Sequence, residues 1–115
     1  MAKITPLTRV IDPESGLPRY VQLEPQPKHK TKIKGYTLKT LAKKIGDLRY
    51  DALSEFLNAL ADKIQEDSKR DKKAKKLKLA KELNDAQEYI RMADDHIHDA
   101  LVISLPRMMK KANNE

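Results

Sequence analysis

The residues best suited to metal chemistry form the run Asp94-Asp-His-Ile-His-Asp99. On a helix, residues three or four apart share a face, so Asp95 could share an ion with His98 or with Asp99. His96 and His98 are two apart and point about 200° from each other, so they cannot both bind one ion. Metal bundles built on carboxylates repeat such a motif on two helices, and this chain has one copy. We assign no metal ligand here, and a metal-binding helical bundle stands as a third interpretation of the chain.

The sequence lacks the residue patterns of the common catalytic and cofactor sites. It has no cysteine, which excludes disulfides, thiol catalysis and cysteine-bound zinc. No Ser-x-x-Lys, Gly-x-Ser-x-Gly, phosphate-binding glycine loop or dinucleotide fingerprint occurs, and all three glycines lie at or before Gly46. We therefore predict a protein without catalytic residues, without a cofactor and without enzyme activity.

Lysine is concentrated in two stretches of the chain, whose net charge is +7. Residues 25–44 hold seven lysines and no acid, and residues 69–81 hold seven lysines, one arginine and one aspartate. Such stretches attract phosphates or acidic protein surfaces. Their one aromatic residue is Tyr36, so base stacking is not expected, and contacts with a nucleic acid would be electrostatic. The candidate residues for a polyanion or an acidic partner are Lys28, Lys30, Lys32, Lys34, Lys69, Arg70, Lys72, Lys73, Lys75 and Lys76.

The segment Thr40-Leu-Ala-Lys-Lys-Ile-Gly46 resembles the first helix and turn of a helix-turn-helix DNA-binding unit. The resemblance covers about residues 40–57 and implies a second helix that enters the major groove. The residues that fit are Leu41, Ala42, Ile45 and Gly46. The next core residue, Leu53, comes one position late, and the second helix would carry Asp47, Asp51 and Glu55, which phosphates repel.

Residues 1–36 are predicted to form an extended N-terminal arm, because all but one of the six prolines lie there. Two β-like runs, 7–11 and 20–23, flank Asp12-Pro-Glu-Ser-Gly16, which is typical of a turn and predicts a loose hairpin. A lone hairpin is marginal in water, so we expect the arm to be partly disordered or docked elsewhere.

Residues 37–105 are predicted to form a helical hairpin. No glycine or proline occurs in the 59 residues from Asp47 to Leu105, and the apolar residues recur at helical spacing. We place the helices at about 38–66 and 73–105, the turn at about 67–72 and a basic tail at 106–115. Gly46 either lies inside the first helix or breaks it, and Pro106 is expected to end the second helix.

The second helix repeats its apolar residues every seven positions, with large residues in one row and alanines in the other. Two helices alone leave part of such wide apolar stripes in water, and a second copy of the chain would cover them as a four-helix bundle. Coverage by the N-terminal arm is the alternative. The predicted self-association residues are Leu53, Phe56, Leu57, Leu60, Leu83, Ala86, Ile90, Ala93, Ile97 and Ala100.

The fold class expected from these patterns is all-α, with an antiparallel hairpin that forms a homodimer. With 36% charged residues, no long apolar run and no secretion signal, the expected location is the cytoplasm, away from membranes. The favoured function is a non-enzymatic assembly module that recruits an acidic protein partner through its lysines. The alternative is a nucleic-acid-binding regulator that uses the same lysines on phosphates.

Overall fold

The computed structural model describes residues 7–24 and 29–109. The chain divides into two compact units, Met1–Leu38 and Lys39–Glu115, and each unit is described by itself. The first is called the N-terminal unit and the second the helical unit.

The N-terminal unit contains the predicted β-hairpin. Strand β1 (Leu7–Ile11) pairs antiparallel with β2 (Pro18–Gln22), and Leu7 lies opposite Gln22. The turn forms because the Asp12 carboxylate accepts the backbone N–H of Glu14 at 2.8 Å and Gly16 adopts a φ of 73°. The hairpin prediction is confirmed, and among the described residues of the N-terminal unit the two strands form a single layer, so most of their residues are exposed.

The first helix ends at Gly46, which settles whether this glycine lies inside a continuous helix. Helix α1 (Leu38–Gly46) stops there, and helix α2 (Tyr50–Lys73) begins after a short turn. The N-cap of α2 is Arg49. The Arg49 guanidinium holds the first-turn residue Asp51 through two hydrogen bonds of 2.7 and 2.8 Å. This pair secures the start of α2, where acidic side chains are favoured by the helix dipole.

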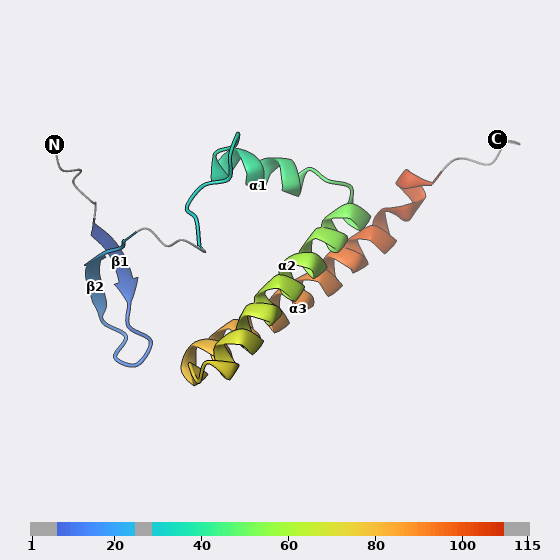
Figure 1. The fold of residues 1–115 in the computed structure, drawn as a ribbon. Helices are drawn as coiled ribbons and strands as arrows, with labels where there is room; N and C mark the ends of the chain where they lie inside the picture. Colours follow the sequence, from blue (N-terminus) through green and yellow to red (C-terminus); the bar gives the residue numbers. More distant parts are fainter. Residues whose placement is uncertain (1–6, 25–28, 110–115) are drawn as a thin grey trace, which may run out of the picture. The chain divides into compact units, whose positions relative to one another are not determined.

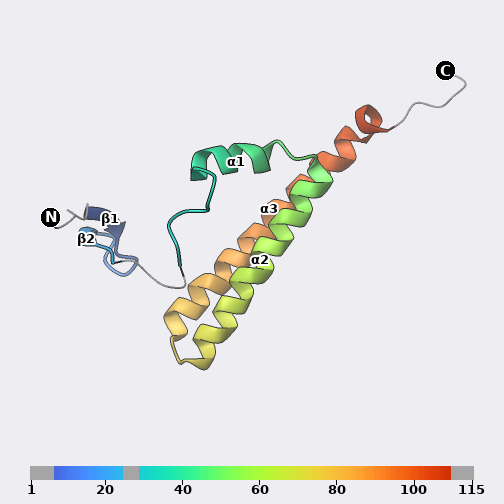
Figure 2. The ribbon, with the colours of Figure 1, turned by 45° about the horizontal axis from the view of Figure 1, so that its top comes forward.

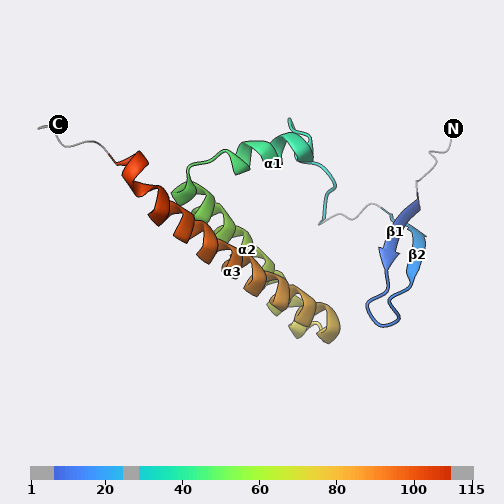
Figure 3. The ribbon, with the colours of Figure 1, turned by 180° about the vertical axis from the view of Figure 1, so that it is seen from behind.

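Helix α2 and helix α3 (Leu77–Met108) form the predicted antiparallel hairpin. They lie side by side along most of α2 (Figure 1), and the same arrangement is seen in the tilted view (Figure 2) and from behind (Figure 3). Because α3 has 32 residues and α2 has 24, the end of α3 extends past the start of α2. The described chain is therefore mostly helical, with one small two-stranded sheet.

The turn between the long helices lies at residues 74–76, so the prediction of a turn at 67–72 was wrong. Residues 67–73 stay helical because charged residues are good helix formers when oppositely charged neighbours pair one turn apart. Asp67 accepts the Lys63 ammonium at 2.6 Å and the Arg70 guanidinium at 2.7 Å. A stretch without apolar residues therefore ends the apolar stripe but not the helix.

Helix α2 ends in a Schellman motif with a lysine at the position that usually holds glycine. The N–H of Lys75 donates to the carbonyl of Lys72 at 3.0 Å, and the N–H of Lys76 donates to the carbonyl of Asp71 at 2.9 Å. Lys75 has a φ of 63°, the left-handed region. The N-cap of α3 is Lys76, which makes no side-chain hydrogen bond.

Helix α3 continues through Pro106 to Met108, so the predicted stop before the proline was also wrong. The proline nitrogen has no hydrogen to donate, and near the end of a helix this removes one bond while the last turn still closes. The N–H of Met109 donates to the carbonyl of Leu105 at 2.8 Å, which completes that turn. Residues 110–115 of the predicted basic tail lie outside the described residues.

The seam between α2 and α3 is lined by small and polar side chains. In the part of the chain that the structure describes, the buried residues are Ala61 and Ser68 on α2 and Ala80, Gln87 and Asp94 on α3. On each helix they are seven residues apart, so they form one row that faces the partner helix. Small side chains let two helix axes approach closely. No large side chain is fully buried within residues 7–24 and 29–109.

The strained residue Lys75 generates a first prediction. Replacing Lys75 with Gly should raise the free energy of unfolding by about 1 kcal/mol, because glycine adopts a positive φ without a Cβ clash. Replacing Lys75 with Val should lower it, and urea denaturation followed by circular dichroism measures both. Equal stability of the two variants would contradict a left-handed residue at this turn.

The Arg49–Asp51 pair generates a second prediction. The hydrogen bonds from Arg49 lower the pKa of the Asp51 carboxyl to about 2, against an ordinary value of about 3.9. A lowered pKa means that the pair stabilises the start of α2 at neutral pH. This contribution is lost as the pH falls from about 4 to about 2. A carbon-13 NMR titration of Asp51 should show the lowered pKa, and Arg49→Ala should return it to the ordinary range.

Candidate interaction surfaces

One flank of the helix pair is joined by hydrogen bonds between side chains of α2 and α3. The Arg91 guanidinium donates to Asp62 at 2.8 Å, to Gln65 at 3.2 Å and to Gln87 at 2.6 Å. The Gln87 amide in turn donates to Asn84 at 3.1 Å. We call this side of the hairpin the polar flank.

Asn58 and Asp94 make a further contact between the two helices on the polar flank. The Asn58 amide donates to Asp94 Oδ2 at 2.7 Å, and Asp94 is 8% exposed. The other carboxylate oxygen, Oδ1, is buried and has no hydrogen-bond partner among the described residues. Asp94 therefore depends on one amide donor, because burying a charged oxygen without a partner is costly.

The opposite flank carries the large apolar side chains, and we call it the apolar face. On α2 the row of Leu57 and Ile64 lies on the other side of the buried Ala61 from Asn58 and Gln65. On α3 each residue of the row Leu83, Ile90 and Ile97 follows a buried residue by three positions, as Ile64 follows Ala61 on α2. The hairpin therefore separates polar contacts on one flank from apolar side chains on the other.

None of the ten predicted self-association residues is buried within the single chain. Phe56 and Leu60 are 36% and 38% exposed, Ala93 is exposed, and the other seven are half-buried. The alanines of this set do not line the buried seam between the two long helices, where the buried alanines are Ala61 and Ala80. The predicted heptad of α3 thus lies beside the helix seam and contributes to the apolar face.

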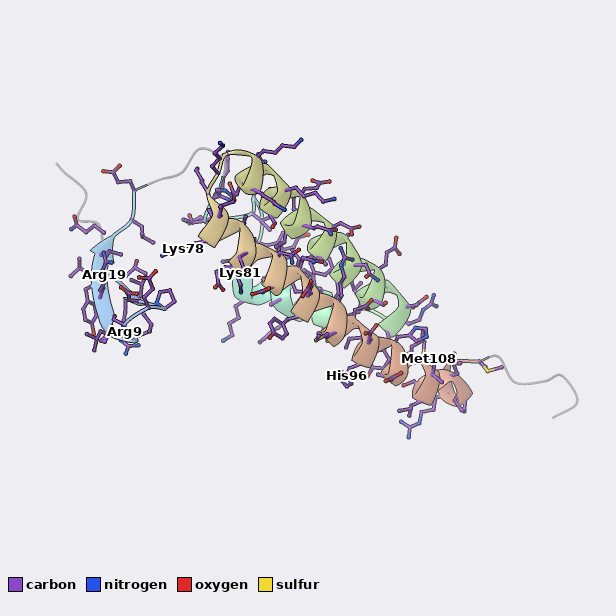
Figure 4. The ribbon with its side chains drawn as sticks, turned by 90° about the horizontal axis from the view of Figure 1, so that it is seen from below. Arg9, Arg19, Lys78, Lys81, His96 and Met108 are labelled. Atoms are coloured by element: carbon purple, nitrogen blue, oxygen red, sulfur yellow. The ribbon has the colours of Figure 1, made fainter. Side chains whose placement is uncertain are left out.

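The turn end of the hairpin is basic. Every lysine and arginine between Lys69 and Lys81 is exposed, while the one acid of this stretch, Asp71, is half-buried. Figure 4 shows Lys78 and Lys81 at this end of α3, with Met108 at the far end of the same helix. We call residues 69–81 the basic end.

The lysines predicted in the N-terminal region are only partly placed. Lys28 lies outside the described residues, and Lys30, Lys32 and Lys34 are exposed in the N-terminal unit. The predicted binding residues of the basic end all lie on one stretch of the helical unit: Lys69, Arg70, Lys72, Lys73, Lys75 and Lys76.

The acid and histidine run of α3 does not form a ligand cluster. Asp94 is buried in the helix seam, whereas Asp95, His96, His98 and Asp99 are exposed. Within residues 7–24 and 29–109, no three acidic or histidine side chains meet in a way that could hold a metal ion.

The segment with the helix-turn-helix resemblance forms two helices separated by a short turn, α1 and α2. A helix-turn-helix unit requires its two helices to pack against each other. Among the described elements, extensive packing occurs between α2 and α3 and between β1 and β2, and α1 has none. The structure thus contains the turn of such a unit but not its packed pair of helices.

Sequence reasoning missed Ser68, Gln87 and Asp94 as seam residues because it ranked positions by hydrophobicity. The signal was present as a second set of heptads, 54, 61 and 68 on α2 and 80, 87 and 94 on α3. The residues at these positions are small or polar: Ser54, Ala61, Ser68, Ala80, Gln87 and Asp94.

Comparisons of the chain with protein-family models, with curated proteins and with solved structures found no match. In the ranges that the structure describes, no helix is both long and apolar enough to cross a lipid bilayer.

The Asn58–Asp94 contact generates a third prediction. Asn58→Leu should lower the free energy of unfolding by about 2 kcal/mol, because it leaves a buried carboxylate without its donor. In an Asp94→Leu background the same change should have little effect, since no buried charge remains. Urea denaturation of the four chains gives the coupling free energy. A coupling near zero would show that the two side chains do not depend on each other.

Proposed function

We propose that this chain is a non-enzymatic assembly module. Two copies pair through their apolar faces into a four-helix bundle, and each copy presents its basic end to an anionic partner. The observation that carries the proposal is that the only buried apolar residues among the described ones are Ala61 and Ala80, while the leucines and isoleucines in the middle of the helix pair lie on one flank.

The flank that carries the apolar face is large enough for a protein interface. Helix α2 has 24 residues, so the whole flank is about 36 Å long, and two helices side by side are about 20 Å wide. The flat area of the flank, about 700 Å², is close to the roughly 800 Å² per partner of a standard stable interface. On α2 the apolar side chains occupy the middle of this flank, from Leu53 to Ile64, so polar residues would form the rim of the interface.

The pattern of the apolar face favours a second copy as its occupant. On α3 a row of large residues, Leu83, Ile90 and Ile97, runs beside a row of alanines three positions later. In a two-fold dimer, the large side chains of each copy would pack onto the alanine row of the other copy. The leucine and isoleucines would then fill the space that the small alanine side chains leave in both copies. A surface that is complementary to itself is what a symmetric dimer requires.

The charges support the same arrangement. All ten predicted self-association residues are uncharged, whereas ion pairs occupy other positions of the long helices, such as Lys63–Asp67, Lys81–Asp85 and Arg91–Asp62. The polar flank is joined within one chain by its own hydrogen bonds. Pairing through the uncharged residues of the opposite flank therefore places no charge at the centre of the interface and leaves these hydrogen bonds in place.

Two exposed neighbours on α3 provide a matched test. Ala93 lies on the apolar face and Met92 lies off it, and both are exposed in the single chain. Ala93→Lys should weaken the dimer by about 3 kcal/mol or more, because it places an unpaired charge in an apolar interface. Met92→Lys should leave the dimer intact, since its side chain stays in water.

Light scattering after size-exclusion chromatography measures the outcome. The unmodified chain and Met92→Lys should elute at twice the chain mass, and Ala93→Lys at the chain mass with its helical circular dichroism retained. An unmodified chain at the single-chain mass, or an Ala93→Lys variant that stays dimeric, would overturn the proposal.

A further inference from the structure

A hollow of about 390 Å³ lies at the basic end, between the last turns of α2 and the first turns of α3. Ser68 and Ala80 lie on the seam beside it, where the Ser68 hydroxyl donates to the Ala80 carbonyl at 2.6 Å. We call this hollow the basic pocket. Its other lining residues are Lys69, Lys72, Leu77, Lys81 and Asn84.

The lining of the basic pocket contains three lysines and no acid. The Lys81 ammonium forms an ion pair of 2.8 Å with Asp85, which does not line the pocket. Lys69 and Lys72 form no ion pair among the described residues, although the neighbouring Arg70 is held by Asp67. Two unneutralised ammonium groups one turn apart therefore line the same hollow, which attracts an anion.

The start of α3 adds positive potential to the same place. Its N-cap Lys76 makes no side-chain hydrogen bond, and the first backbone bond of the helix runs from the N–H of Ala80 to the carbonyl of Lys76. The N–H groups of the first turn, which includes the lining residue Leu77, therefore point out of the helix end without intrahelical acceptors. This end of the helix dipole is equivalent to about half a positive charge.

The lysine-rich lining of the basic pocket suits a phosphate group. Lysine binds phosphate as a point charge from any direction, whereas arginine grips phosphate and carboxylate alike through two parallel hydrogen bonds. The basic end has seven lysines and one arginine, and that arginine is already bonded to Asp67. The Ser68 proton is engaged by Ala80, so the lysines must supply the recognition.

The basic surface is larger than one phosphate requires. Lysines continue around the turn beyond the pocket, at 73, 75, 76 and 78, and all are exposed. A polymer with regularly spaced phosphates would contact several of them at once and release counterions at each contact. Residues 69–84 contain no aromatic side chain, and single strands are bound by stacking on aromatics. A duplex is therefore the better fit.

We propose that the basic end binds the sugar–phosphate backbone of a nucleic-acid duplex, with one phosphate seated in the basic pocket between Lys69, Lys72 and Lys81. The contact is independent of base sequence, because phosphates position a duplex without identifying its bases. The inference rests on the proposed function in treating the basic end as the surface for an anionic partner. It does not rest on dimerisation, because one hairpin contains the whole pocket.

The test is a fluorescence anisotropy titration of the full chain against a labelled DNA duplex of about 20 base pairs, at about 50 and about 200 mM salt. The unmodified chain should bind at low salt and weaken steeply as salt is added. Lys69→Gln/Lys72→Gln should weaken binding at least about tenfold at low salt and reduce the slope of log K against log salt by about 2. Duplexes of scrambled sequence should bind equally.

A charge-matched control is Lys43→Gln/Lys44→Gln on α1, which removes two charges from residues that do not line the pocket. It should keep the affinity within about twofold of the unmodified chain. No duplex binding at low salt, or equal losses in the two double variants, would overturn the proposal. Displacement of the duplex by polyglutamate at equal charge would also overturn it and would assign the pocket to an acidic protein.

Measuring the mass of each sample by light scattering separates the two proposals. A chain that is dimeric but does not bind the duplex would contradict the basic pocket alone. An Ala93→Lys monomer should still bind the duplex. Adding Lys69→Gln/Lys72→Gln to this monomer should lower the slope of log K against log salt, which would support the pocket whatever the assembly state.

Discussion

The small and polar seam between α2 and α3 is the constraint on which the rest of the structure depends. Ala61 and Ser68 face Ala80, Gln87 and Asp94, and side chains of this size let two helices pack closely. Because small and polar residues occupy the buried row, the large apolar side chains lie beside it on one flank, where another surface can cover them.

The polar flank explains how a pair of helices with so little apolar burial keeps a unique arrangement. Hydrophobic contact alone is non-directional, whereas the Asn58–Asp94 and Arg91–Asp62 contacts each require one pairing of residues on α2 and α3. A helix shifted by one turn would leave Asp94 buried without a donor, which costs more than the bond contributes. Polar contacts thus determine the register, and the apolar face remains available for assembly.

Sequence patterns were sufficient for the helices and the hairpins, because each depends on local signals such as the Asp12–Gly16 turn and the uninterrupted run from Asp47 to Leu105. The sequence patterns failed where tertiary contacts or local ion pairs determine the ends of the helices. The turn lies at 74–76 rather than at the predicted 67–72, because ion pairs extend α2. Helix α3 continues through Pro106 because this proline lies in its last turn. The apolar and lysine-rich residues were identified, but the seam and the basic pocket were not, since neither follows from hydrophobicity.

The central claim is that the apolar face is covered by a second copy of the chain. The most direct test is the thermal unfolding midpoint of the unmodified protein, measured over about a hundredfold range of concentration. Coupled folding and dimerisation predict that the midpoint rises with concentration by mass action. A midpoint that does not change with concentration would show that the single hairpin folds without its copy, and would contradict the account.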